Sequence, residues 1–262
     1  MESVPKLYDW AFIPRADAGG AHECAKYVAR FAVPEDWGGD LRVLEAYLEA
    51  NFELAYMQGR VVTEPERYSY WRAGRLLSLT GEPITIVCVR NKVEDRQPFF
   101  FVRVCVGQRF NVTVDGEDVT LDAPPPPEYE PPEFRPDYFL RYNFDHYLGD
   151  HSERIEPFAP GLNNYQRFLF IYGAINQAKL HWSDLVVPSW YRDRNATAGR
   201  YQWLLPLFLR VEDHSLKPDL IATLDPDDEL MHYSIRTLIL PEWAYPHARA
   251  INKGGGQFRH WR

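Results

Sequence analysis

The sequence has few cysteines, no basic excess and no long hydrophobic run, and each of these absences excludes a class of protein. Its three cysteines are widely spaced and form no CxxC pair, which argues against a disulfide framework and against a cysteine zinc site. A net charge of −8 argues against broad, salt-driven binding of duplex nucleic acid. No apolar run approaches the length of a signal or membrane helix, so we expect a cytoplasmic protein without membrane contact.

Three motifs of common enzyme sites are missing as well. There is no GxSxG elbow, no GxGxxG turn after a strand and no HExxH pair. These absences disfavour a serine hydrolase of that kind, a dinucleotide site of the Rossmann type and a zinc protease site. No motif in the sequence identifies a cofactor, and a metal site is less favoured than a site without metal.

Aromatic residues are abundant, at 15% of a chain whose hydrophobic and charged fractions, 45% and 25%, are ordinary. Many rings can line a cavity for planar ligands, but filling a core is the default interpretation. The 262 residues suffice for one large domain or two small ones.

The N-terminal part has one strong helix signal, over residues 40–58. Asp40 is the predicted N-cap and Gly59 the predicted stop. Apolar residues recur every three or four positions at Leu41, Leu44, Leu48, Phe52 and Ala55. The opposite side, which we expect to face solvent, carries Glu45, Glu49 and Glu53.

Strand signals follow this helix. Residues 84–90 and 98–106 predict an antiparallel hairpin with a longer loop. Residues 109–122 predict a second, shorter hairpin that turns at Asp115-Gly116. The proline-rich stretch 123–133 favours an extended, stiff connection across the surface.

The C-terminal part mixes both kinds of element. We expect a helix over 163–180, a loop-like passage over 181–202, strands over 203–211, 219–225 and 231–240, a turn at Asp225-Pro-Asp-Asp, and a helix over 242–252 broken near Pro246. Pro206 favours an edge strand or a bulge. Strands that follow one another without regular helical crossovers predict an α+β fold with a mixed, mainly antiparallel sheet and flanking helices. The expected organisation is 1–122, a connection 123–133 and 134–262, together one compact unit.

Several segments together resemble a bacterial family known as domain of unknown function 3825. They are LYDWAFI (7–13), FELAYMQGRV (52–61), QPFFFVRVC (97–105), YNFDHYLGDHSERI (142–155), YGAINQAKL (172–180), VPSWY (187–191), QWLLPL (202–207), PDLIATL (218–224), the strand 233–240 and WAYPHARAI (243–251). The family is similar to proteins that carry cold-shock-like or LOTUS-type RNA-binding modules beside this domain. The resemblance implies a role around RNA or nucleotides.

Polar residues concentrate among aromatic rings in the stretch 134–158. His146 is the candidate acid or base, oriented by Asp145 or Asp150. If the segment is helical, Asn143 and Arg154 lie on the same face as His146, and Arg154 could hold a phosphate or carboxylate. The alternative is a capped helix start with Arg154 in a structural ion pair.

A second cluster comes from the C-terminal strands. Asp219 precedes one strand, and His232, Ser234 and Arg236 share one face of another. Further substrate-binding candidates along a basic edge are Lys179, Arg200 and Gln202. Polar alternation on a strand is also typical of a solvent-facing side.

These patterns predict a protein that binds a nucleotide, an RNA end or another small anionic ligand and acts on it. The reaction would be hydrolysis or transfer at a phosphate or glycosidic centre, with charge stabilised by the cationic residues. Two alternatives stay open. One is a non-catalytic module whose aromatic rings stack on unpaired bases. The other is a small-molecule tailoring enzyme with a closed, mostly apolar pocket.

Overall fold

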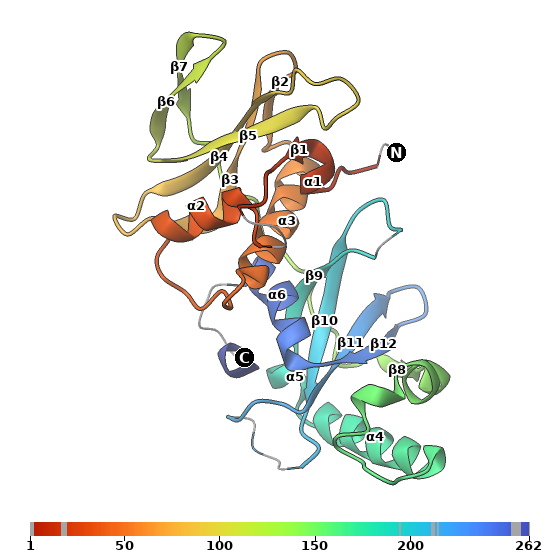
Figure 1. The fold of residues 1–262 in the computed structure, drawn as a ribbon. Coiled ribbons are helices and arrows are strands. Elements are labelled where there is room, and N and C mark those ends of the chain that lie inside the picture. Colours follow the sequence, from red (N-terminus) through yellow and green to blue (C-terminus); the bar gives the residue numbers. More distant parts are fainter. Residues whose placement is uncertain are drawn as a thin grey trace. The chain divides into compact units, whose positions relative to one another are not determined.

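The computed structural model describes residues 3–16, 20–193, 195–210, 213, 215–252 and 258–261, without the side chains of Tyr147, Asp150 and Arg259. The chain divides into two units, Met1–Glu130 with Arg192–Gly199 and Pro131–Tyr191 with Arg200–Arg262. The division at Glu130 falls inside the proline-rich stretch. Each unit combines helices with a mainly antiparallel sheet (Figure 1), which confirms the predicted α+β class.

The first unit is built on a sheet with the strand order β1-β5-β4-β3-β2. Its strands are β1 (Ala11–Phe12), β2 (Val62–Glu64), β3 (Tyr68–Leu77), β4 (Pro83–Arg90) and β5 (Phe99–Val106). Strands β4 and β5 form the predicted antiparallel hairpin, and β1 joins β5 in parallel. Strand β3 was not predicted, because Arg72, Gly74 and Arg75 interrupt its apolar alternation.

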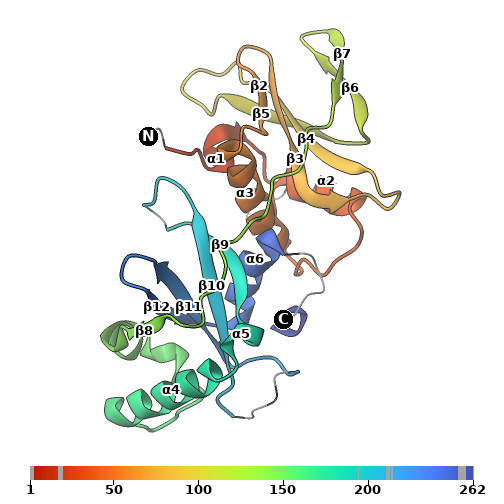
Figure 2. The same ribbon diagram turned by 180° about the vertical axis from the view of Figure 1, so that it is seen from behind.

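Three helices cover one face of this sheet (Figure 2). They are α1 (Leu7–Trp10), α2 (Glu23–Phe31) and α3 (Arg42–Met57). The predicted apolar stripe of α3 is confirmed, since Leu44, Leu48 and Phe52 are fully buried in the core beneath them. The N-cap position is held by Leu41 rather than by the predicted Asp40, whose Oδ1 nevertheless accepts a hydrogen bond from the N–H of Arg42 at 3.2 Å.

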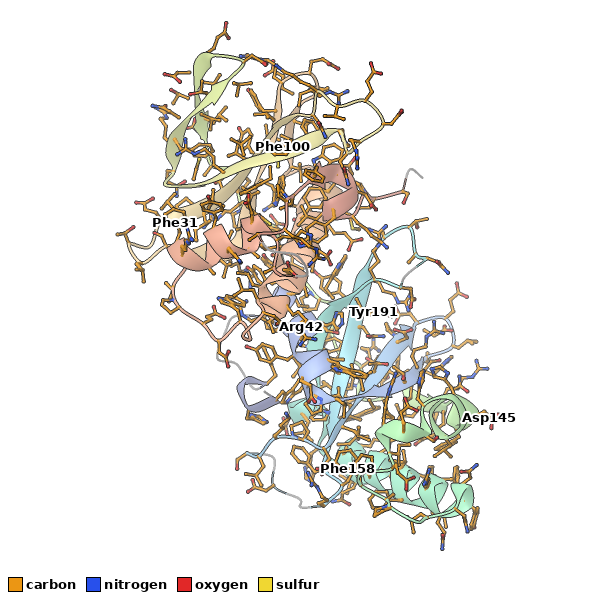
Figure 3. The ribbon with its side chains drawn as sticks, viewed as in Figure 1. Phe31, Arg42, Phe100, Asp145, Phe158 and Tyr191 are labelled. Atoms are coloured by element: carbon orange, nitrogen blue, oxygen red, sulfur yellow. The ribbon has the colours of Figure 1, made fainter. Side chains whose placement is uncertain are left out.

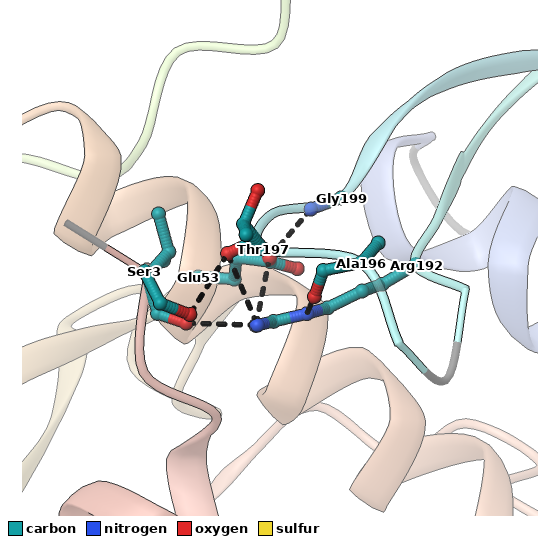
Figure 4. A network of polar contacts seen from close by, with 7 residues as sticks. Ser3, Glu53, Arg192, Ala196, Thr197 and Gly199 are labelled. Carbon is teal, nitrogen blue, oxygen red and sulfur yellow. Dashed lines mark hydrogen bonds and ion pairs between the residues drawn. The ribbon is translucent and has the colours of Figure 1, made fainter. Parts of the chain in front are cut away.

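The prediction that the acidic side of α3 faces solvent is wrong for two of its three carboxylates. Glu45 accepts hydrogen bonds from the backbone N–H and the Nδ1 of His22, both at 2.7 Å. Glu53 is buried and accepts hydrogen bonds from Nη1 of Arg192 at 3.0 Å and from the N–H of Gly199 at 2.6 Å (Figure 4). These partners lie far away in the sequence, so the local pattern of α3 could not indicate them.

A second hairpin covers part of the opposite face of the first sheet. It consists of β6 (Arg109–Val114) and β7 (Glu117–Asp122). Its turn is at Asp115 and Gly116, as predicted, and both residues have positive φ, 51° and 85°. Two adjacent positive φ values match the turn type that joins twisted antiparallel strands most readily.

The proline-rich stretch runs along the first unit with one side buried. Pro124 and Pro127 are buried while Pro125 is exposed, a period of three residues that fits a polyproline II helix. Gln58 binds the backbone of Glu128 twice, donating from Nε2 to the carbonyl at 3.0 Å and accepting from the N–H at 2.8 Å. Arg60 donates to the carbonyl of Pro126. The stretch is therefore extended, as predicted, and bound by α3 and the residues that follow it.

The second unit contains a sheet with the strand order β8-β12-β11-β10-β9. Its strands are β8 (Phe139–Tyr142), β9 (Val187–Tyr191), β10 (Arg200–Leu207), β11 (Leu220–Asp227) and β12 (His232–Ile239). Strand β8 is parallel to β12, and the other pairs are antiparallel. Its helices are α4 (Asn164–Lys179), α5 (Trp182–Leu185) and α6 (Pro241–Ile251). Helix α4 confirms the predicted helix and begins at a capping box formed by Asn163 and Gln166.

Four expectations for this unit are corrected. The passage 181–202 contains α5, all of β9 and the start of β10 rather than a loop. Strand β11 continues to Asp227, past the predicted turn at Asp225. Helix α6 runs through Pro246 without a break. Strand β10 is internal rather than at an edge, but its pairing with β9 ends at Leu204. Pro206 lies beyond that point and is paired with Ile221 on β11, so its missing N–H removes no hydrogen bond to β9.

Candidate functional site

The register of the second sheet separates an apolar face from a polar one. The side chain of Gln202 on β10 is hydrogen-bonded to that of Asp225 on β11, and Asp225 is paired with Ser234 on β12. Neighbours in register point to the same side of a sheet, whereas the residues between them point to the other. The intervening Leu224 and Ile235 lie in the core beneath α4. Gln202, Asp225 and Ser234 therefore define a polar face on the side away from that core.

Asp225 is the centre of a hydrogen-bonded cluster on this polar face. Its Oδ1 accepts from Nε2 of Gln202 at 2.7 Å. Its Oδ2 accepts from Nη2 of Arg200 at 2.8 Å and lies 3.0 Å from Nε of Arg236. The carboxylate is 13% exposed, and the two arginine side chains are 44% and 57% exposed. The arrangement fixes two guanidiniums while leaving much of each accessible to a ligand.

A register shift in the strand pairing lies at Arg236. Between the pairs Ala222–Leu238 and Leu224–Ile235, β12 has one residue more than β11. An extra residue of this kind bends a strand and turns its side chains, and such bulges occur often beside functional sites. Arg236 lies within this segment and reaches back to Asp225.

The polar face continues across β12 to the edge strand β8. His232 is buried, and its Nε2 lies 3.1 Å from Oγ of Ser234. Phe139 is paired with His232 and Arg141 with Ser234, so both belong to the same face. Phe139 is 74% exposed, an unusual position for a large apolar ring, and Arg141 is exposed as well.

The stretch around His146 does not form the single α-helical face that was considered. A π-helical turn η1 (His146–Asp150) is followed by a 3-10 turn η2 (Ser152–Arg154). The rings of His146 and His151 are 4.7 Å apart and nearly perpendicular, and Nδ1 of His151 lies 3.4 Å from Glu153. Asn143 is exposed, and Asp145 lies exposed at the outer edge of the second unit (Figure 3). The side chain of Asp150 lies outside the described part of the structure.

Arg154 forms an ion pair with Glu153, the carboxylate beside His151, with its Nε 3.6 Å from Oε1. Its Nη1 donates to Oγ1 of Thr237 at 3.0 Å and to the carbonyl of Leu238 at 2.8 Å. Its guanidinium lies 5.2 Å from the centre of the Trp243 ring. These contacts connect the end of β12 to the start of α6, and the ion pair with Glu153 is of the kind expected under the structural alternative for this arginine.

Two other predicted site residues lie away from the polar face. Asp219 binds the N–H groups of Leu209 and Arg210 at 2.7 and 3.1 Å, at the end of β11 opposite to Asp225. Lys179 lies over the Trp182 ring, 5.1 Å from its centre. The structure thus brings together Gln202, His232 and Arg236 with Arg200 and Ser234. Asp225, which the sequence pattern assigned to a turn, was missed.

A hollow of about 260 Å³ lies elsewhere in the second unit. It is lined by Asp184, Leu185, Val187, Pro206, Phe208, His260 and Trp261. Burial lowers the pKa of His260, so this imidazole is neutral at physiological pH. The lining residues that the structure describes therefore include no fixed positive charge, and they match an anionic ligand less well than the polar face does.

The fold and the polar face define an α+β protein with oriented arginines on an open sheet. The chain belongs to the family described as domain of unknown function (DUF3825), whose model matches residues 28–257. No curated protein and no solved structure matches the chain. Within the described residues, no helix has the length and apolar character needed to cross a membrane.

Proposed function

We propose that this protein binds a nucleotide or the end of a single-stranded RNA on the polar face of its second sheet. The observation that carries the proposal is the convergence of Arg200 and Arg236 on one oxygen of Asp225. One carboxylate oxygen thus orients two guanidiniums that stay partly exposed. Guanidiniums held in place lose less conformational freedom when they bind a phosphate.

The neighbouring side chains suit the rest of such a ligand. An exposed ring on an open sheet face offers a platform for a base, and Phe139 has that position. Arg141 adds a third cation on the same face. The cations are local, which agrees with a chain of net charge −8 that lacks a broad basic surface.

The proposal is tested by the fluorescence anisotropy of a 5′-phosphorylated, 3′-labelled oligouridylate. Arg236→Met removes a charge-assisted contact worth about 1.5–3 kcal/mol, so we expect the affinity to fall roughly tenfold or more. Phe139→Ala removes a stacking contact and is expected to cost about 1–3 kcal/mol. Added salt weakens binding, with a slope of about −0.7 for each phosphate contact.

The matched control is Arg109→Met, which removes an exposed arginine paired with Asp122 on the β6–β7 hairpin. This variant is expected to bind like the wild-type protein. Equal affinities for wild-type, Arg236→Met and Phe139→Ala proteins would refute the assignment of the polar face. A complete lack of RNA or nucleotide affinity would favour the small-molecule enzyme instead.

A catalytic role for His146 is a second proposal, favoured by its ring contact with His151 and by Glu153 beside that second imidazole. Adjacent imidazoles and a carboxylate can pass a proton between them. Prolonged incubation of the oligonucleotide with wild-type and His146→Ala proteins separates turnover from binding. A product formed equally by both proteins would exclude His146 as the acid or base.

A further inference from the structure

Two polar side chains lie side by side on the first sheet, each with a buried atom that has no hydrogen-bond partner among the described residues. Arg72 on β3 is paired with Thr85 on β4, and Thr85 is paired with Cys105 on β5. Residues paired in this way point to the same face of the sheet and are close neighbours. The row lies on the face that carries Tyr70 and Val87, which pack against the β6–β7 hairpin.

Thr85 is fully buried, with none of its surface exposed. Its Oγ1 has no hydrogen-bond partner among the described residues. Most buried polar groups in proteins are hydrogen-bonded, because a lone hydroxyl in an apolar environment is costly. An unpartnered hydroxyl of this kind points to a ligand or a water at the position that it faces.

Arg72 is half-buried, and its Nε is fully buried without a partner among the described residues. None of the carboxylates in the described residues forms an ion pair with it. Burial lowers the pKa of this guanidinium, because a charged group loses hydration where water is partly excluded. By contrast, the buried Arg192 is paired with Glu53.

We propose that Arg72 and Thr85 form a binding site for a small oxyanion of the phosphate type. The guanidinium supplies the charge and N–H donors, and the threonine hydroxyl supplies a further donor on the same face of the sheet. One anion satisfies both side chains and neutralises the arginine. The site lies in the first unit and is independent of the polar face of the second sheet.

Isothermal titration calorimetry with inorganic phosphate, at ionic strength held constant with sodium chloride, tests the site. Arg72→Met and Thr85→Val are each expected to weaken phosphate binding tenfold or more relative to the wild-type protein. The control Arg96→Met removes an equal charge from an exposed loop and is expected to bind phosphate like the wild-type protein. If methyl phosphate binds as tightly as inorganic phosphate, the site accepts a phosphate ester. If methyl phosphate binds more weakly, the site is assigned to the free ion.

The midpoint of thermal unfolding, Tm, is a second measurement that is independent of the titration. Without phosphate, Arg72→Met removes an uncompensated charge and is expected to raise the Tm or leave it unchanged. Phosphate is expected to raise the Tm of the wild-type protein and not that of Arg72→Met or Thr85→Val. Equal phosphate effects in all three proteins would overturn the proposal. So would a crystal structure grown in phosphate in which a single water bridges Arg72 and Thr85.

Discussion

Replacing Arg192 by Met is expected to destabilise the first unit strongly. Arg192 donates from Nη1 to Glu53 at 3.0 Å and from Nη2 to the carbonyls of Val4 and Thr197 at 2.8 and 3.1 Å. Its Nε donates to the carbonyl of Ala196 at 3.2 Å. The side chains of the ion pair are 13% and 6% exposed, so water cannot take over these contacts.

The expected magnitude follows from what the substitution leaves behind. Without the guanidinium, the Glu53 carboxylate stays buried with the N–H of Gly199 as a remaining donor, at 2.6 Å. Removing one partner of a buried ion pair typically costs about 3–5 kcal/mol, because the other charge is left uncompensated. Glu53→Gln in the Arg192→Met background removes that charge and is expected to restore part of the loss.

Hydrogen exchange of the α3 amides, together with urea denaturation, measures this loss within the first unit. The matched control is Arg109→Met, whose ion pair with Asp122 has side chains that are 71% and 69% exposed. We expect no measurable change in that variant, because exposed pairs contribute little. If Arg192→Met lowers the free energy of unfolding by less than about 1 kcal/mol, the reasoning from burial is wrong.

Further substitutions test other parts of the fold. Gly74 has a φ of +57°, and a Cβ added there would meet oxygen atoms of two α3 side chains. Gly74→Ala is therefore expected to lower the stability measured by thermal denaturation by about 2–4 kcal/mol. The control Gly173→Ala adds a Cβ into open space on α4 and is expected to raise stability by up to about 1 kcal/mol. Arg154→Met is expected to lower stability by about 1–3 kcal/mol in urea denaturation, while His146→Ala leaves it nearly unchanged; the reverse order would exchange their roles.

Local periodicity predicted the elements whose apolar residues recur regularly. The stripe of α3, the β4–β5 hairpin and the capped helix α4 each show a pattern that is complete within the element or across one loop. Strand β3 escaped prediction because Gly74 must approach the α3 side chains closely, and a glycine between arginines interrupts the strand pattern. Strand β9 is short and begins beside Pro188, which made it look like part of a loop.

The candidate site was predictable only in part, for a related reason. The alternation of β12 placed His232, Ser234 and Arg236 on one face, which the structure bears out. The central carboxylate was missed because Asp225 precedes a proline and two aspartates, a pattern typical of a turn. Asp225 accepts a hydrogen bond from Gln202, a residue that becomes its neighbour only when β10 pairs with β11.

The run of prolines along the first unit makes the length of that segment more important than its composition. Pro124 and Pro127 face inward while Pro125 faces outward, so every third residue packs against the first unit and this selection depends on position in the helix. Exchanging Pro125 for another residue leaves this selection intact. Deleting Pro125 would rotate everything beyond it by about a third of a turn, because a polyproline II helix has three residues per turn. The carbonyl of Pro126, which accepts from Arg60, would then point elsewhere. A segment that looks like an adjustable spacer is therefore one in which insertions and deletions are least tolerated.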